Sequence, residues 1–483
     1  MKRTVKLIGA VILCALLFAT LSLSALANSA VVDYEDEGAE ATAIIVADEN
    51  TPLTVEKELL TLDIEELPKS RYRYSEEAKN FKSAVTAEYT IYNPTEKDVT
   101  ARLLFPFGST PDYIDRETVC ELITKDERFG ITFNGAKAAT DIRHSYSPYV
   151  FYGEFDTEKE LSKLSDSYID DGFYFANQTV TKYIFEVTEA NFDWDNMTEV
   201  VFNINDKSGK RAYYFPEQSG YYEKSDGSAE VSVWVDEIGQ HIAIYVLGEP
   251  LDQGLSGRFY VGMKKSSGKL VPLSPEQTTL EEFLLRGWSE ASGVSKVDWF
   301  NAMVASSKES AIGLSQPVTD VDYEGLWFEE DLMQWYDYMI TVPAGARVVN
   351  TVCAPIFPSI NEGYTPPIYE YTYLLSPAES WKEFGELEIV INTPHYLALK
   401  SSVAFSKTDG GYTAKLSGLP DKELTFILSS SPNPESPTSF FEDFFSADNL
   451  LLVLPIIGVV GMLIGGIVVV IVAKSRNKEG KNK

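Results

Sequence analysis

The chain has 483 residues, with 41 Lys and Arg against 72 Asp and Glu, and its formal net charge is −31. A chain this acidic repels phosphate backbones, so its composition argues against nucleic acid as a partner. It contains three cysteines, too few for a disulfide framework, and no paired C-x-x-C spacing predicts a zinc site.

The first 27 residues have the three parts of a secretory signal peptide. Basic residues precede an apolar stretch (7–23), and the small-x-small sequence Ala-Leu-Ala (25–27) is a cleavage site. The next segment (28–51) is crowded with Asp and Glu and predicts a flexible acidic leader. We therefore expect cleavage before Asn28 and a folded chain that begins near residue 52.

Alternating apolar and polar residues predict strands over the next two hundred residues. The segment from Lys82 to Tyr92 alternates, and Asn93-Pro94-Thr95-Glu96 predicts a turn that closes a hairpin with a strand from Val99 to Phe105. Further predicted strands are Glu199 to Ile204, Ala229 to Val235, His241 to Leu247 and Arg258 to Met263. Residues 52–265 are predicted to form one β-rich domain.

One family resemblance lies in residues 82–108. Tyr92-Asn93 before the turn, and Leu104-Phe105-Pro106-Phe107 after it, resemble a vault/inter-alpha-trypsin (VIT) type β-domain. The resemblance implies a β-sandwich. It implies no site residues, because the Asp-x-Ser-x-Ser metal motif of the von Willebrand A-type domain that often accompanies this family does not occur in the sequence.

Aromatic residues are dense between Tyr146 and Trp194. Such residues bury large areas and favour strands, which makes core packing the first interpretation. The alternative is a set of exposed rings that stack against the sugars of a cell-wall polymer.

The pattern changes to a helical period in residues 266–330, which predict a helical connector. Ser274-Pro275 is expected to open one helix that carries Leu280, Phe283 and Leu284 on one face, and Ser295 is expected to cap a second. Strands return in residues 331–430, a predicted second β-rich domain with strands at Met333 to Val342, Arg347 to Ala354, Ile368 to Leu375, Glu386 to Asn392 and Tyr412 to Leu416. Residues 431–449 are rich in Pro and Phe and predict a stalk.

Residues 450–473 form an uncharged apolar run followed by a basic tail (474–483). The run is long enough for a transmembrane helix, and the basic tail predicts a cytoplasmic C-terminus with the large acidic part outside the cell membrane. The protein is therefore predicted to be a single-pass type I membrane protein. Gly461 and Gly465 have the small-xxx-small spacing at which two such helices pair, which predicts a possible homodimer.

The acidic segment at 320–331 approximates a calcium-binding loop. Asp320, Asp322 and Glu324 stand at alternate positions before a glycine, and Asp331 stands eleven positions after the first ligand. Calcium is the only cofactor that the sequence suggests, and a solvated acidic loop explains the same residues.

No catalytic motif is present: the three histidines form no H-E-x-x-H run, and no G-x-S-x-G sequence occurs. We expect a mainly β fold, with two β-sandwich-like units joined by a short helical segment, and one C-terminal transmembrane helix. The leading function is a bacterial cell-surface protein, not an enzyme, whose ectodomain binds an unidentified protein or cell-wall polymer. The alternatives are an exported hydrolase with an unrecognised carboxylate site and an envelope scaffold that dimerises through the transmembrane helix.

Overall fold

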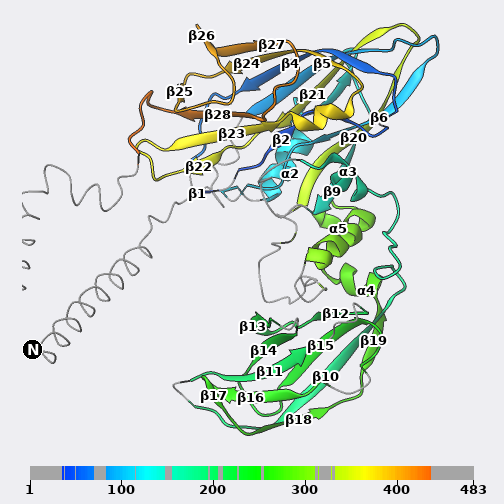
Figure 1. Cartoon of the computed structure of the whole chain (residues 1–483), viewed down its shortest axis with the longest axis vertical. Helices are drawn as coiled ribbons and strands as arrows, with labels where there is room; N and C mark the ends of the chain where they lie inside the picture. The colour runs from blue at the N-terminus through cyan, green and yellow to red at the C-terminus, as the bar shows by residue number, and fades with distance from the viewer. Residues whose placement is uncertain are drawn as a thin grey trace, which may run out of the picture.

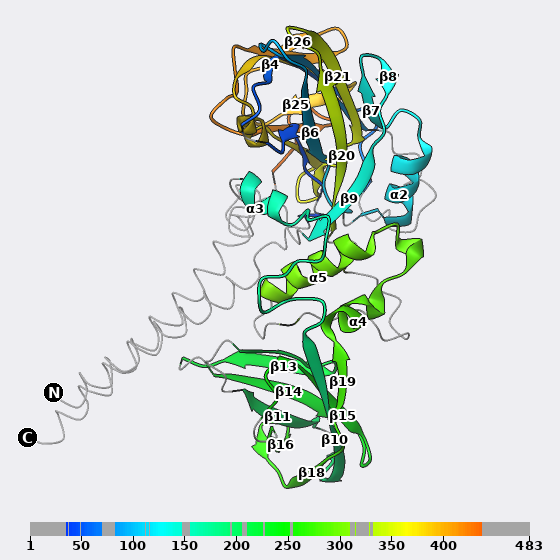
Figure 2. The same cartoon turned by 90° about the vertical axis from the view of Figure 1, so that its right-hand side faces the viewer.

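The computed structural model describes residues 35–36, 38–48, 50–69, 83–111, 113–114, 116–146, 155–193, 196–204, 210–225, 228–251, 255–309, 314, 328 and 332–436. The described chain is mainly β, as predicted, and its strands form two β parts with helices between them (Figure 1, Figure 2). We call the strands of residues 35–146 and 332–436 the main part, and the strands of residues 179–279 the insert.

The main part contains three sheets. An eight-stranded sheet has the order β26 (Ser406–Thr408), β27 (Gly411–Leu416), β24 (Phe384–Asn392), β4 (Thr54–Asp63), β5 (Ala84–Tyr92), β21 (Arg347–Pro355), β7 (Gly130–Phe133) and β8 (Ala136–Lys137). A six-stranded sheet has the order β1 (Glu35–Asp36), β22 (Ser359–Asn361), β23 (Ile368–Leu374), β28 (Leu424–Ser429) and β25 (Tyr396–Ala398), and β2 (Ala41–Thr42) also pairs with β23. The third sheet has four strands, β3 (Ile45–Val46), β6 (Val99–Pro106), β20 (Leu332–Val342) and β9 (Asp141–Tyr146).

The insert contains two five-stranded sheets packed on a separate core. One has the order β12 (Arg211–Tyr214), β15 (His241–Gly248), β10 (Thr179–Ala190) and β18 (Gly268–Pro272), with β19 (Glu276–Thr279) also pairing with β10. The other has the order β13 (Gln218–Glu223), β14 (Ala229–Val235), β11 (Thr198–Ile204), β16 (Gly257–Val261) and β17 (Lys264–Lys265). Their inner faces share a core that includes Val187, Phe202, Val231 and Ile244. The insert is therefore a β-sandwich.

Short helices connect the strands. They are α2 (Arg116–Lys125), α3 (Thr157–Ser162), α4 (Leu280–Leu284), η2 (Leu285–Gly287), η3 (Glu290–Ser292), α5 (Lys296–Glu309) and η4 (Ser376–Ser380). Ser295 caps α5 as predicted, because its Oγ accepts from the backbone N of Asp298 at 3.0 Å. The helix expected at Ser274 begins later: Glu276–Thr279 pair with β10, and Thr279 with Glu282 forms the capping box of α4.

The strands do not divide into the two successive domains that the sequence suggested. Strands of the expected first domain (52–265), such as β4 and β5, pair with β24 and β21 of the expected second domain (331–430). Residues 179–279 form the separate unit instead, inserted between the two halves of the main part. The helices that follow residue 279 lie between the two β parts, as expected for a connector. The predicted domain boundaries at 265 and 331, however, do not coincide with the ends of the sheets.

The predicted hairpin around Asn93 is wrong. Strand β5 lies in the eight-stranded sheet and β6 in the four-stranded sheet, so the Asn-Pro segment turns a corner between two sheets. Asn93 is fully buried, and its side-chain Nδ2 donates to the carbonyl oxygens of Lys97 and Val342 at 2.7 and 2.9 Å. The second corner, between β20 and β21, lies against the first, with the backbone N of Gly345 donating to the carbonyl oxygen of Thr95 at 3.0 Å.

The flexible leader predicted at 28–51 also needs correction. Residues Ala41 to Val46 are almost completely buried, and they contribute β2 and β3 to two sheets of the main part. The acidic composition concealed this apolar segment. At the other end, residue 435 of the predicted stalk still pairs with Thr365 through two backbone hydrogen bonds of 3.0 and 2.9 Å.

The predicted signal peptide (1–27) and apolar run (450–473) lie outside the described residues. Within the described part of the chain, no helix combines the length and the apolar character needed to cross a membrane. The membrane topology therefore stays a prediction from the sequence.

Replacement of one glycine tests how closely two strands of the eight-stranded sheet are packed. Strand β4 has a bulge between Val55 and Lys57, and a Cβ on the facing Gly385 would stand 2.1 Å from the carbonyl oxygen of Glu56. We expect Gly385→Ala to lower the free energy of unfolding by about 1–3 kcal/mol, because the backbone of β4 has to move. Gly410→Ala is the matched control, since a Cβ there meets nothing within 4 Å. Urea unfolding of both variants measures the difference, and equal stabilities would contradict the tight register of β4 and β24.

Candidate functional site

The residues predicted to bind calcium or to pair helices are not part of the described structure. Asp320, Asp322, Glu324 and Asp331 lie outside the described residues, and so do Gly461 and Gly465 of the apolar run. In the part that is described, no three His, Cys, Asp or Glu side chains gather as a metal site requires. Calcium binding and helix pairing therefore stay predictions.

The described histidines and cysteines lie on five different segments of the chain: His144 on β9, His241 on β15, His395 before β25, Cys120 on α2 and Cys353 on β21. His144 is buried in β9, where desolvation, aided by the positive charges of Arg116 and Arg143, lowers its pKa to about 3. It is therefore neutral at physiological pH. Cys120 and Cys353 both keep their thiols, and burial raises the pKa of the Cys353 thiol.

The aromatic segment from 146 to 194 serves mainly as core. Phe155, Tyr174 and Phe185 are buried, and the ring of Tyr168 packs against Phe300 of α5 with 4.5 Å between centroids. The described rings of this segment therefore do not form the sugar platform considered from the sequence. Phe192 is the exception, with 46% of its surface exposed in the loop between β10 and β11.

Exposed aromatic side chains instead occupy the outer face of the insert's second sheet, which we call the insert face. Trp234 of β14 is 47% exposed and Tyr222 of β13 is 64% exposed. Figure 2 shows this sheet stacked on the one that contains β10 and β15, so one of its faces is turned away from the sandwich core. The insert face comprises Glu199, Val201, Asn203, Tyr222, Glu230, Ser232, Trp234, Arg258 and Tyr260.

Strand register orders these side chains into rows across the sheet. Glu199 of β11 lies opposite Trp234 of β14 on one side and opposite Tyr260 of β16 on the other. Val200, Val233 and Phe259 are the strand neighbours of these three residues, and they are buried in the sandwich core. Because side chains alternate along a strand, Glu199, Trp234 and Tyr260 point to the opposite, outer face. Two strand spacings separate Trp234 from Tyr260, a distance of about 10 Å.

Polar contacts hold the insert face in place. The indole Nε1 of Trp234 donates to Oε1 of Glu199 at 3.3 Å, which joins the ring to the neighbouring strand. Glu230 pairs with Lys224 at 2.7 Å between Nζ and Oε1, and also with Arg258. The hydrogen bond from the Lys224 ammonium lowers the pKa of the Glu230 carboxyl below its usual range, because it outweighs the opposite effect of partial desolvation. Arg258 lowers this pKa further. The surface therefore combines aromatic rings with fixed charges and hydrogen-bonding groups.

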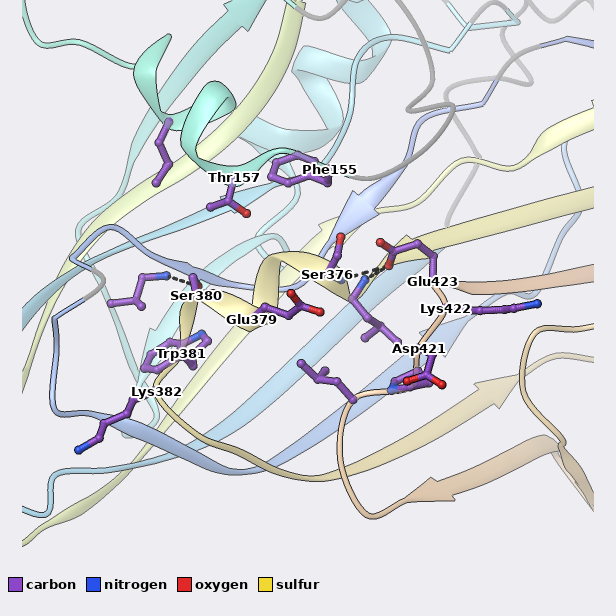
Figure 3. A pocket seen from close by; sticks show the side chains of 15 residues that line it. Phe155, Thr157, Ser376, Glu379, Ser380, Trp381, Lys382, Asp421, Lys422 and Glu423 are labelled. Atoms are coloured by element: carbon purple, nitrogen blue, oxygen red, sulfur yellow. Dashed lines mark hydrogen bonds between the residues drawn. The ribbon is translucent and has the colours of Figure 1, made fainter.

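A cleft of about 760 Å³ lies between α3 and η4, at one side of the main part. Figure 3 shows Phe155 and Thr157 on one side and the η4 residues on the other, with Glu379 toward the centre and Lys382 and Lys422 reaching away from it. Its volume is within the range of small-ligand sites. The cleft is thus a second candidate site.

Three polar side chains of this cleft, Glu423, Ser380 and Trp381, have structural roles. A carboxylate oxygen of Glu423 accepts from the backbone N of Leu375 and, at 3.1 Å, from that of Ser376, which caps η4. Ser380 Oγ accepts from the backbone N of Val46 at 3.1 Å, and Trp381 Nε1 donates to the carbonyl oxygen of Ile44 at 2.9 Å. These contacts fasten η4 to the N-terminal segment of the main part.

Burial raises the pKa of two described carboxyls that do not line the cleft. Glu160 of α3 is desolvated and pairs with Lys163 at 2.7 Å. Glu58 of β4 is completely buried, and desolvation raises its pKa to about 7. The Oε1 of Glu58 accepts from the hydroxyl of Tyr373 at 3.2 Å, and that hydroxyl lies 3.1 Å from the hydroxyl of Tyr89. This network belongs to the core of the main part, with no opening to solvent at Glu58.

The insert face was missed by the sequence reasoning, although a signal for it exists. The strand Ala229–Val235 alternates, and its polar positions are Glu230 and Ser232. Trp234 continues that polar series, so the period of the strand places a large aromatic ring on the solvent side. An aromatic residue in the polar half of an amphipathic strand was the observation to use.

Comparisons with known proteins do not assign a family. No protein-family model matches the chain, and no curated protein matches it. Among solved structures, a chain described as a "putative nutrient binding protein" from Legionella pneumophila is 13% identical, with 82% of this chain and 72% of that chain covered. Its TM-score is 0.29, which is too low to support any conclusion about this protein.

Proposed function

We propose that the protein is a membrane-anchored cell-surface protein whose β-rich ectodomain binds a partner through the insert face. The signal peptide and the apolar run predicted from the sequence supply the anchor and place residues 28–449 outside the membrane. In this arrangement the main part is the rigid body that carries the insert. No catalytic step is needed for this function.

The observation that supports this proposal best is the exposure of Trp234 and Tyr222 on regular strands. Neither ring is needed to fill the sandwich core, because Val231, Val233 and Phe202 already do so. Leaving large aromatic rings in water forgoes their burial, which is worth about 2–3 kcal/mol for a fully buried side chain. Exposed aromatic groups on a rigid surface are typical of binding sites.

The two alternative functions have less support. An exported hydrolase would be favoured by carboxyls of raised pKa in one deep cleft, but Glu58 and Glu160 lie outside the lining of the cleft described above. A scaffold that dimerises through Gly461 and Gly465 is compatible with the proposal, since helix pairing would leave the insert face open to a partner.

Binding of the full-length protein to whole cells of its source, from which its own gene has been deleted, tests the proposal. We expect Trp234→Ala combined with Tyr222→Ala to weaken binding by about tenfold or more, because truncating central aromatic residues of an interface typically costs 1–2 kcal/mol each. Binding is measured with labelled protein in mild detergent over a concentration series.

Tyr396→Ala is the matched control for this experiment. Tyr396 is also an exposed strand tyrosine, at 40%, but it lies on β25 of the main part. We expect it to bind as the unmodified protein does. Loss of binding in the control together with full binding by the double variant would place the partner on the main part and refute the proposal.

A further inference from the structure

The row formed by Trp234, Glu199 and Tyr260 has the geometry of a site for a chain-like ligand. The two rings stand on strands β14 and β16, on either side of Glu199, and the backbones of these two strands are about 10 Å apart. That is close to the length of two linked sugar rings. Because Trp234 Nε1 donates to Oε1 of Glu199, the indole is oriented before any ligand arrives.

The chemistry of the insert face fits a sugar better than a protein surface. A pyranose ring has an apolar C–H face that packs on an aromatic ring, and hydroxyl groups at its rim that need donors and acceptors. Each ring of the row has such a group beside it, since Glu199 adjoins both, and Arg258 and Ser232 lie in the next row. The centre of a protein–protein interface usually contains few charged residues. The insert face, in contrast, contains several.

The negative charge of the chain favours an uncharged sugar polymer over an anionic one. A net charge of −31 repels polyanions, and two cations at this surface, Arg258 of the insert face and the neighbouring Lys224, are already paired with Glu230. An uncharged polymer incurs no such repulsion.

We propose that the insert face binds a neutral glycan chain, with every second sugar stacked on an aromatic ring, first Trp234 and then Tyr260, and the sugar between them hydrogen-bonded to Glu199. This inference rests on the proposed function and specifies its partner. Trp234 and Tyr260 supply the stacking surfaces, and the carboxylate between them accepts from sugar hydroxyls.

Treatment of the target cells distinguishes a glycan from a protein partner. Periodate cleaves the vicinal diols of sugars, whereas a broad protease removes exposed proteins. We expect periodate to reduce binding of the full-length protein by about tenfold or more and protease to leave it unchanged, with binding nearly constant up to about 0.5 M salt because an uncharged ligand is not screened. Pull-down with cellulose, mannan and xylan, whose sugars have such diols, then gives the purified probes, of which at least one should retain the protein.

Single variants assign the residues. Trp234→Ala, Tyr260→Ala and Glu199→Gln should each weaken retention on that polysaccharide by about threefold to tenfold or more, while Tyr396→Ala should not. If protease abolishes cell binding and periodate does not, or if none of the three polysaccharides retains the protein, the glycan inference is wrong. The proposed function survives that result as long as the insert-face variants still lose cell binding, and both fail if these variants bind cells normally.

Discussion

Replacement of Arg143 by Met is expected to lower the free energy of unfolding by about 3–5 kcal/mol, the cost of leaving a buried carboxylate without its cation. Arg143 lies on β9, and its side chain is 13% exposed. Its Nη2 donates to Oδ1 of Asp298 at 2.8 Å, and Asp298, on α5, has a side chain that is only 1% exposed. The pair therefore fastens the helix beside the insert to the edge of the main part.

Two comparisons separate this effect from general loss of packing. Arg102→Met removes a neighbouring cation that bonds Asp337, but Arg143 still lies 3.5 Å from that carboxylate, so we expect about 1 kcal/mol or less. The double variant Arg143→Met/Asp298→Asn removes both charges and keeps an acceptor for the backbone N of His144. It should regain at least half of the lost stability.

Thermal unfolding of the full-length variants measures the loss of stability, and hydrogen exchange of the α5 amides measures how firmly the helix is held. The single Arg143 variant should lose protection in α5 before the main sheets open, because the junction is held by this pair. Normal α5 protection in that variant would contradict the claim that the Arg143–Asp298 pair holds α5 in place.

Stability should fall between pH 4.5 and pH 7 because of one buried carboxyl. Desolvation raises the pKa of Glu58 from 4.5 to about 7 in the folded chain. A raised carboxyl pKa means that the folded state holds its proton more tightly, so this contribution is complete below about pH 4.5 and is lost as the pH rises through about 7. A shift of this size corresponds to about 3 kcal/mol.

The variant Glu58→Gln isolates this contribution from the many surface carboxylates. A glutamine keeps an acceptor for the hydroxyl of Tyr373 but does not ionise, so the stability difference between variant and parent should be small at pH 4 and reach about 2–3 kcal/mol in favour of the variant at pH 8. Glu88→Gln is the control, because Glu88 is an exposed glutamate on the neighbouring strand β5. Urea unfolding at a series of pH values gives the comparison. A difference that does not change with pH would mean that Glu58 titrates normally.

Local pattern predicted strands well and their partners poorly. The segments Ala229–Val235 and Arg347 to Ala354 were predicted almost to the residue, because alternation and β-branched side chains are local properties of a half-buried strand. Nothing in the local sequence shows that β5 pairs with β21, which follows more than 250 residues later. The alternation within a strand shows which face is buried, but it does not identify the neighbouring strand. The nested arrangement of the main part and the insert therefore needed the structure.

Turn chemistry also had two interpretations that the sequence could not separate. Asn93-Pro94 is a good turn whether it joins paired strands or turns a corner between sheets. The deciding fact is tertiary: the buried Asn93 side chain donates to backbone carbonyls of both corners. The buried segment at residues 41–46 was hidden in a similar way, because acidic neighbours dominated the composition of a window that also contains Ala-Ile-Ile-Val.

Photocrosslinking from the insert face tests the central claim most directly. A diazirine-bearing residue in place of Ser232, in the row between Trp234 and Glu230, would react with whatever lies on that face in living cells. The same group in place of Thr413, on β27 of the main part, is the control. We predict adducts from position 232 that are lost when Trp234 is replaced by Ala, and none from position 413. Adducts from position 413 without any from position 232 would contradict the assignment of the binding surface to the insert face.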